Sequence, residues 1–326
     1  MAGGIKRKIK AVKNIEMTIE DILEIYIQEK KALNKSEKTI INIQGSMKRW
    51  MDYLVLSEYS MNISDVDSSY VYSFMNHCLN EEMKPTTLNH YLRDIRAFVY
   101  WCIDKKYITD AFKVKLATED EVIKDTYTDE EMELLLQKPH RDASFVEFRT
   151  WAIINWIFAT GNRASTVCSI QMKDLNFTKK EIIIQKTKTH KAMIIPFSPS
   201  LMTCIKDYIR RFRSDATDEE FLFPNVGNLP LTVNALKSSV QNYNKSRGVD
   251  KTSVHAFRHT FAKNWIRATG DVFRLQKLLG HSTLEMTKRY VNMFSDDLKE
   301  GFEKFNPLDR MKQRSSRTHA IKRNNE

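Results

Sequence analysis

The sequence predicts a mainly α-helical fold with a small β-sheet (α+β), divided into two domains. The chain has 326 residues, which is long for a single hydrophobic core. Its nine Gly and seven Pro are too few for a β-sandwich rich in tight turns. Apolar residues recur at helical spacing along most of the chain, and short β-type runs occur only within residues 172–197.

Residues 15–108 predict a bundle of four helices. The first begins near Thr18, where a hydroxyl followed by Asp21 is typical of a helix cap. The others are expected over about 36–55, 65–80 and 86–104. The last of these carries an apolar stripe at spacings of three and four, formed by Leu88, Leu92, Ile95, Val99 and Cys102. A basic arm, residues 1–14, precedes this domain.

Residues 109–126 are polar without sustained periodicity, so we expect a linker there. A second domain, 127–308, begins with a helix capped by Thr128, followed by a long apolar helix over about 143–160. The runs 181–185 and 192–196 predict a β-hairpin, and helices follow to about residue 304. Residues 309–326 form a basic tail of low hydrophobicity.

The net charge of +11 predicts a polyanionic partner, such as nucleic acid, an acidic membrane surface or an acidic protein. A solvated lysine face would give the same charge. The longest apolar run, around 151–160, is far below the roughly 20 residues that cross a bilayer, and no secretory signal follows the basic start. Four cysteines without a C-x-x-C pair favour a reduced, cytoplasmic chain without zinc.

Two segments of the second domain carry cations suited to phosphate. Gly161 is expected to end the long apolar helix, and Arg163 follows, with a planar guanidinium that can hold two phosphate oxygens. A surface cap is the alternative for such an arginine. Residues 186–191 lie at the hairpin tip, where a lysine can reach into a groove and donate a proton, or simply be solvated.

Two further segments combine histidines, an arginine and a tyrosine. His255 and Arg258 lie three residues apart and therefore share one face of a helix. Gly280 is expected to end another helix, with His281 in the elbow after it. Tyr290 lies nine residues after His281, on the next helix. Each residue alone has a common structural explanation, but their combination in one basic chain indicates phosphodiester chemistry.

The order Arg, Lys, His-x-x-Arg, Gly-His, Tyr resembles the tyrosine recombinase family, which includes phage integrases, Xer-type resolvases and transposon integrases. The similarity runs from about 128 to 306, and residues 15–108 look like the family's helical, SAM-like core-binding domain. The resemblance implies a site-specific recombinase of a mobile element that cuts and rejoins DNA through a 3′-phosphotyrosyl bond. It implies six catalytic residues: Arg163, Lys188, His255, Arg258, His281 and Tyr290.

In that scheme Tyr290 is the nucleophile, and Arg163, Arg258 and His281 bind the scissile phosphate. Lys188 protonates the leaving 5′-oxygen, with Lys186 as a competitor for this role, and His255 helps to take the tyrosine proton. The ester energy stays in the covalent bond, so neither ATP nor a metal cofactor is expected.

The sequence departs from the family pattern at two positions. The usual Gly-Leu-Arg box has Asn162 in place of Leu, and Thr166 replaces a glutamate found in many members three residues after the arginine. The second change removes an expected partner of Arg163 and leaves open how its guanidinium is held.

The expected partner is double-stranded DNA carrying recombination sites, without a membrane. Candidate DNA contacts are Lys35, Lys38, Lys48, Arg49, Arg93, Arg96, Lys186 and Lys191. Apolar residues recur at helical spacing after Tyr290, at Val291, Phe294, Leu298, Phe302 and Phe305. The resemblance implies that this C-terminal helix is exchanged between protomers of a homotetramer on paired, nucleoid-associated sites. An accessory DNA-bending or directionality factor fits the same scheme.

Three alternatives stay open at this level. A type IB topoisomerase-like enzyme shares the arginine, lysine, histidine and tyrosine chemistry but relaxes DNA as a monomer. An Xer-type resolvase of chromosomes or plasmids would act on different sites. A DNA-binding regulator would keep the fold without catalysis, although the complete set of six residues disfavours it.

Overall fold

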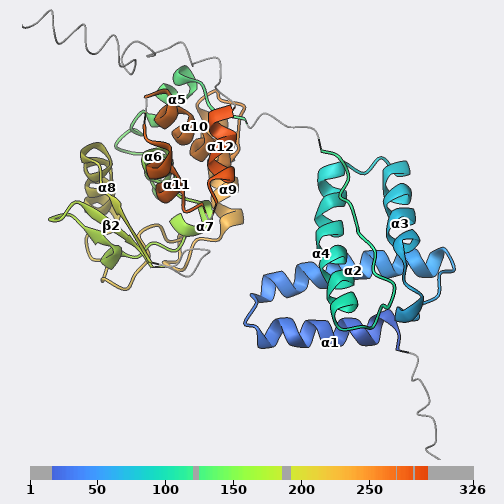
Figure 1. Cartoon of the computed structure of the whole chain (residues 1–326). Helices are drawn as coiled ribbons and strands as arrows, with labels where there is room; N and C mark the ends of the chain where they lie inside the picture. Colours follow the sequence, from blue (N-terminus) through green and yellow to red (C-terminus); the bar gives the residue numbers. More distant parts are fainter. Residues whose placement is uncertain (1–16, 120–124, 186–191, 269, 282, 293–326) are drawn as a thin grey trace, which may run out of the picture. The chain divides into compact units, whose positions relative to one another are not determined.

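The computed structural model describes residues 17–119, 125–185, 192–268, 270–281 and 283–292. The chain forms two compact units, Met1–Glu121 and Val122–Glu326, each with its own hydrophobic core (Figure 1). The predicted mainly α-helical fold with a small sheet is confirmed. Within the described ranges, no helix combines the length and the apolar character that crossing a membrane requires.

The first unit is built around α2 (Glu37–Leu56), which contacts α1 (Ile19–Ala32), α3 (Ser68–Asn80) and α4 (Pro85–Asp104). The predicted cap of α1 is a reciprocal capping box: Thr18 N donates to Asp21 Oδ2 at 2.9 Å, and Asp21 N donates to Thr18 Oγ1 at 3.1 Å. At the centre of the unit, Trp50 is fully buried and its indole N–H donates to Tyr70 O at 3.1 Å.

Local capping explains where α3 begins. The sequence indicated a helix over about 65–80, but Ile63–Asp65 form a 3-10 turn and α3 starts at Ser68. The cause is Asp67, whose carboxylate accepts from Ser69 N at 2.8 Å and satisfies a free donor of the first turn. The apolar stripe of α4 is as predicted, since all five of its residues are fully buried.

Residues 109–119, expected as part of a linker, form no helix or strand but pack on the first unit. Val114 is buried, and Asn89 of α4 exchanges two hydrogen bonds of 2.8 Å with the backbone of Ala117. Glu119 accepts from Arg93 at 3.1 Å. The segment that follows α4 therefore belongs with the helical unit as far as residue 119.

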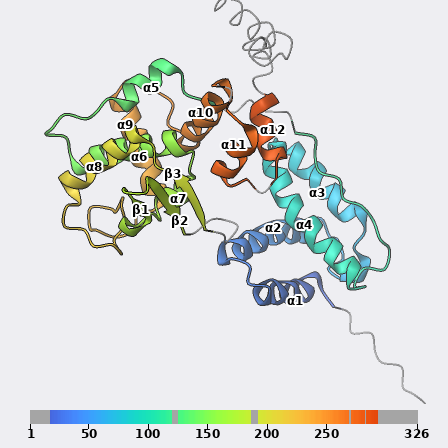
Figure 2. The same cartoon turned by 60° about the vertical axis from the view of Figure 1, so that its left-hand side comes forward.

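The second unit is organised around α6 (Phe145–Thr160), the predicted long apolar helix. It contacts α5 (Asp129–Leu136), α8 (Pro199–Phe212), α9 (Val233–Ser246) and α10 (Val254–Arg267) (Figure 2). A helix that is apolar on all sides must be covered on all sides. These neighbours cover α6 so well that ten of its sixteen residues are buried.

A three-stranded antiparallel sheet lies beside this helical core. Its order is β1 (Leu175–Asn176), β2 (Glu181–Ile184) and β3 (Met193–Pro196), with Ile182 opposite Ile195. The predicted β2–β3 pair is confirmed, whereas the short β1 was not recognised in the sequence. Ile182 and Ile195 face the core, while Ile194 is 61% exposed, as the alternation of a half-buried strand requires.

The last described part of the chain forms α11 (Val272–Leu279) and α12 (Glu285–Asn292), both of which contact α10. Phe261, Leu275, Leu279 and Tyr290 form a small separate core between these three helices. The sequence predicted helices from the hairpin to about residue 304. Residues 213–232, between α8 and α9, are instead irregular. The C-terminal helix expected after Tyr290 lies outside the described residues beyond Asn292.

Candidate active site

Two helices of the second unit end on glycines, as the sequence predicted. Gly161 ends α6 with φ 65°, and Gly280 ends α11 with φ 60°. Both values lie in the left-handed region, which glycine adopts without a Cβ penalty. The carbonyl groups at such helix ends have no partner within the helix and carry partial negative charge. They therefore offer sites for cations.

Two arginines occupy these sites. Arg258 of α10 is 5% exposed and donates to Gly161 O at 2.6 Å and to Leu279 O at 2.9 Å. Arg163, at the start of α7 (Ala164–Val167), donates to Leu279 O at 3.2 Å and to Gly280 O at 3.5 Å. Among the described residues, the two guanidiniums donate to backbone carbonyls and to the His281 ring, and none of these partners is a carboxylate. The two positive charges are thus held in place without being neutralised.

Arg258 stays charged at neutral pH although a second guanidinium lies close to it. Burial is the main cause that lowers the pKa of Arg258, to about 10, and repulsion from Arg163 adds to it. A pKa of about 10 still leaves the group protonated at pH 7. This positive charge therefore persists under the conditions in which an anion would bind.

The arginines line a cavity of about 390 Å³. Ser165, Thr166 and Ser169 add hydroxyl groups, and Ile184 and Met193 line it from the ends of β2 and β3. Two unneutralised guanidiniums with hydroxyl groups beside them suit a tetrahedral anion such as a phosphate.

His281 is oriented from both sides. Its Nε2 lies 3.0 Å from an Arg258 nitrogen, and its Nδ1 lies 2.8 Å from Thr287 Oγ1. Arginine can only donate, so Nε2 accepts and the neutral ring carries its proton on Nδ1. Thr287 is fully buried on α12. Its hydroxyl oxygen accepts the hydrogen bond from Nδ1 and thereby fixes the orientation of the ring.

Tyr290 of α12 lies beside these groups and is 2% exposed. Its hydroxyl is 2.8 Å from His259 Nδ1, and its ring is parallel to that of His281 at a centroid distance of 6.2 Å. Burial raises the pKa of Tyr290, and the charge and hydrogen bond of Arg258 oppose this rise. A protonated phenol is a weak nucleophile, so chemistry at this oxygen requires a proton acceptor.

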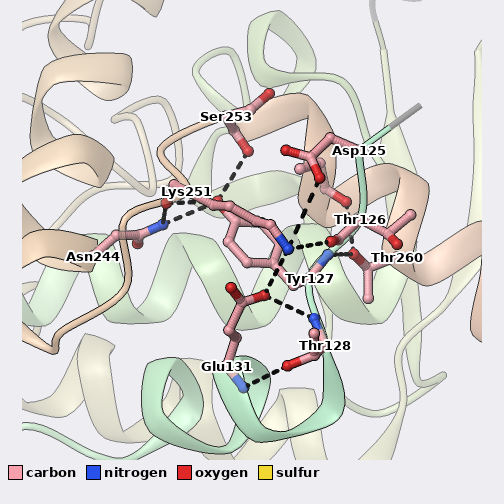
Figure 3. A network of polar contacts seen from close by, with 10 residues as sticks. Asp125, Thr126, Tyr127, Thr128, Glu131, Asn244, Lys251, Ser253 and Thr260 are labelled. Atoms are coloured by element: carbon pink, nitrogen blue, oxygen red, sulfur yellow. Dashed lines mark hydrogen bonds and ion pairs between the residues drawn. The ribbon is translucent and has the colours of Figure 1, made fainter. Parts of the chain in front are cut away.

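A polar network fixes the helix that supplies Arg258 (Figure 3). Tyr127 N donates to Thr260 Oγ1 at 2.9 Å, and the Tyr127 ring stacks on Phe257 at 4.2 Å. Just before α10, Lys251 donates to Thr126 O at 3.0 Å and to Glu131 Oε2 at 3.1 Å. These contacts tie α10 to the segment that leads into the second unit.

The structure brings four of the six sequence-predicted residues together: Arg163, Arg258, His281 and Tyr290. His255 is exposed on α10 and lines a second cavity, of about 280 Å³, with Lys237 and Gln241. Lys188 lies outside the described residues, as do Lys186 and Lys191. Ile184 and Met193, on either side of that stretch, line the arginine cavity.

His259 and Thr287 were not singled out in the sequence. His259 follows Arg258 directly, on a helix where His255 and Arg258 already formed a recognisable pair. His259 matters because it contacts Tyr290, which lies 31 positions away in the chain. The spacing of residues along α10 cannot predict a contact with another helix. The only local signal was that His255 and His259 are one helical turn apart.

Both departures from the family pattern have structural counterparts. Asn162 is buried, and its Oδ1 accepts from the indole N–H of Trp156 at 2.9 Å, so it ties the end of α6 back to the helix. Thr166 lines the arginine cavity. The carbonyl groups of Leu279 and Gly280 hold Arg163 where a glutamate was expected to do so.

The candidate DNA contacts of the helical unit differ in their surroundings. Lys35 and Lys38 are exposed, and Arg96 is half-buried. The other three lie near carboxylates: Lys48 is 3.4 Å from Asp52, Arg49 is 3.8 Å from Glu81, and Arg93 is 3.1 Å from Glu119. Exposed pairs of this kind contribute little to stability, so a phosphate can replace the carboxylate at low cost.

The sequence of the chain matches two family models and several known recombinases. Residues 126–296 match the phage integrase family, and residues 18–116 match the phage integrase SAM-like domain. The chain is 25% identical over 272 residues to tyrosine recombinase XerC of Staphylococcus haemolyticus (strain JCSC1435), covering 80% of this chain and 91% of the relative. It is 24% identical over 300 residues to tyrosine recombinase XerD of Staphylococcus aureus (strain Mu50 / ATCC 700699), covering 90% and 99%.

Solved structures share the fold. A lambda integrase tetramer bound to a Holliday junction matches with a TM-score of 0.66 and 15% identity, over 85% of this chain and 78% of that one. The Tn1549 transposon integrase in complex with a circular intermediate DNA matches with a TM-score of 0.65 and 22% identity, over 82% and 94%.

The close packing around Gly161 generates a stability prediction. A Cβ at Gly161 would lie 2.5 Å from the Phe261 ring and 2.8 Å from Leu279, whereas a Cβ at Gly248 has nothing within 4 Å. Both glycines have φ near 70°, so alanine costs each roughly 1–2 kcal/mol of backbone strain. We expect Gly161→Ala to lose about 1–3 kcal/mol more than Gly248→Ala because of overpacking. Equal losses in urea-induced unfolding would contradict the packing described.

Proposed function

The chain belongs to the phage integrase family and is a site-specific recombinase, and we propose that it cuts and rejoins double-stranded DNA with Tyr290 as nucleophile. One observation carries the proposal. Arg163, Arg258, His281 and Tyr290 come from separate segments of the chain and meet around two helix ends. A buried tyrosine beside two unneutralised guanidiniums is suited to attack on a phosphodiester.

In the proposed reaction, the phenol oxygen of Tyr290 attacks the scissile phosphorus. A 3′-phosphotyrosyl bond forms, and the bond to the 5′-oxygen breaks. Arg163 and Arg258 bind the non-bridging oxygens and stabilise the charge that develops there. The helix-end carbonyls use only some of their N–H groups, since each guanidinium has five. His281 orients the guanidinium of Arg258 through Nε2, and it can itself donate to the phosphate if Nε2 gains a proton and releases Arg258.

The leaving group needs a proton, which we assign to Lys188 in the stretch between β2 and β3. The support is indirect: the strand ends on either side of that stretch line the arginine cavity. His255 helps to take the tyrosine proton in the family pattern. The ester energy is conserved in the phosphotyrosyl bond and the arginines supply the positive charge, so the scheme calls for no cofactor.

We further propose that the chain is the integrase of a mobile element, acting in the cytoplasm on nucleoid DNA. The relatives and structures reported above are recombinases and integrases, which favours strand exchange over relaxation by a type IB topoisomerase. An Xer-type resolvase is the second candidate, supported by the two staphylococcal relatives. Attachment sites or inverted repeats flanking the gene would distinguish the two, and recombination with purified protein alone would show whether an accessory factor is needed.

Replacing the nucleophile tests the proposal. Tyr290→Phe removes only the phenol oxygen, so we expect strand cleavage of a nicked suicide substrate to be abolished and DNA binding to be retained. Tyr208→Phe is the matched control, because it makes the same change at a buried tyrosine of α8. Covalent adduct formation by Tyr290→Phe at the wild-type rate would refute the mechanism.

A leaving-group substitution tests the assignment of Lys188. We expect Lys188→Ala to slow cleavage of normal DNA far more than cleavage of a substrate with a 5′-thiolate leaving group, which needs little protonation. Lys186→Ala is the comparison within the same stretch. If the selective rescue appears with Lys186→Ala instead, the proton comes from that lysine.

The segment after Asn292 tests assembly. Strand exchange between two duplexes needs four active sites, and we propose that the apolar C-terminal helix docks on a neighbouring protomer to close a homotetramer. Truncation after Asn292 is expected to keep single-site binding and to abolish synapsis. Mass photometry with one and with two DNA sites provides the measurement. Four-subunit complexes formed by the truncated chain would exclude this helix as the assembly element.

A further inference from the structure

Helix α10 presents two histidines one turn apart, and they have different surroundings. His255 is exposed and lines the second cavity, beside Lys237 and Gln241. His259 is half-buried, with Nδ1 2.8 Å from the Tyr290 hydroxyl and a ring-centroid distance of 5.6 Å to the tyrosine ring. The two histidines are therefore not interchangeable as partners of the nucleophile.

The hydrogen bond between Tyr290 and His259 defines two atoms between which a proton can move. The hydroxyl of Tyr290 and Nδ1 of His259 lie 2.8 Å apart, so one of these two atoms donates to the other. A phenol oxygen that attacks phosphorus must lose its proton, and His259 Nδ1 lies within hydrogen-bond distance of that oxygen. His259 Nδ1 can receive that proton when its neutral ring is the tautomer protonated on Nε2.

We propose that His259, rather than His255, accepts the phenol proton of Tyr290 during strand cleavage. The O–H bond of Tyr290 breaks and its proton moves to His259 Nδ1, while the phenol oxygen bonds to phosphorus. The bond from phosphorus to the 5′-oxygen breaks, and that oxygen leaves with the electron pair and takes a proton from the separate acid. In rejoining, the released phenolate takes its proton back from His259. The inference rests on the proposed function.

The surroundings of Tyr290 make a dedicated acceptor necessary. At 2% exposure the hydroxyl has little access to a water molecule that could take the proton. Among the residues that the structure describes, the other charged or titratable groups near the pair are Arg163, Arg258 and His281, with Lys263 one turn further along α10. Of these, the cations cannot accept a proton, and His281 Nε2 already accepts from Arg258. His259 is in direct hydrogen-bond contact with the phenol and can accept its proton at Nδ1.

The experiment compares His259→Asn and His255→Asn in the full chain, with covalent adduct formation measured from pH 5 to 9 on the 5′-thiolate substrate. That substrate removes the demand for a general acid. An asparagine amide can keep a hydrogen bond to Tyr290 but cannot accept a proton at these pH values. A neutral imidazole is required, so the wild-type rate should rise with pH as the acceptor histidine loses its proton and should then level.

We expect His259→Asn to slow adduct formation by about 10²- to 10⁴-fold at neutral pH and to lose this levelling, so that the rate rises further in alkaline solution. His255→Asn should keep the wild-type shape of the profile, whatever its rate. A fluorotyrosine of lower pKa at position 290 should restore part of the rate of His259→Asn, which a merely structural role of His259 would not allow.

Three results would overturn the inference: a wild-type rate and profile in His259→Asn, loss of the levelling in His255→Asn alone, or no gain from fluorotyrosine in His259→Asn. Failure of the proposed function has a different signature, because in that case adducts would still form with Tyr290→Phe or would not form with the wild-type chain at all.

Discussion

The active site depends on one electrostatic arrangement, in which the carbonyl ends of two helices hold two arginines that no described carboxylate neutralises. Dipolar carbonyls orient a guanidinium without cancelling its charge. The positive field therefore remains available to a phosphate. A glutamate beside Arg163 would orient the side chain equally well but would also offset part of that charge. Gly161 lets the end of α6 pack against Phe261 of α10 and Leu279 of α11, where a Cβ would lie 2.5 Å and 2.8 Å from these side chains.

The rest of the second unit holds these groups in position. The buried helix α6 ends at Gly161, and the hydrogen bond between Asn162 and Trp156 secures that end. Tyr127 and Lys251 hold α10, so the helix with Arg258 and His259 is fixed by the same segment that enters the unit. Thr287 holds the ring of His281 from α12. Each of these contacts directly positions a residue of the site, so a small change at any of them would displace a reacting group.

Features encoded by neighbouring residues were predictable from the sequence. The capping boxes at Thr18 and Thr128, the glycine that ends α6 and the β2–β3 pair all depend on residues close in the chain. Features that depend on distant residues were not. Residues 109–119 pack on α4 through Asn89, and His259 meets Tyr290 across 31 positions. The carbonyl partners of Arg163 carry no sequence signal, because any residue supplies a backbone carbonyl.

The central claim is that the phenol oxygen of Tyr290 forms the covalent bond to DNA within this site. The most direct measurement is mass spectrometry of the protease-digested adduct trapped on a nicked suicide substrate carrying the protein's own recombination site. The account predicts a single nucleotide-linked peptide, with the 3′-phosphate on Tyr290. A nucleotide attached to any other residue, or a DNA strand cleaved without a covalent link to the protein, would contradict it.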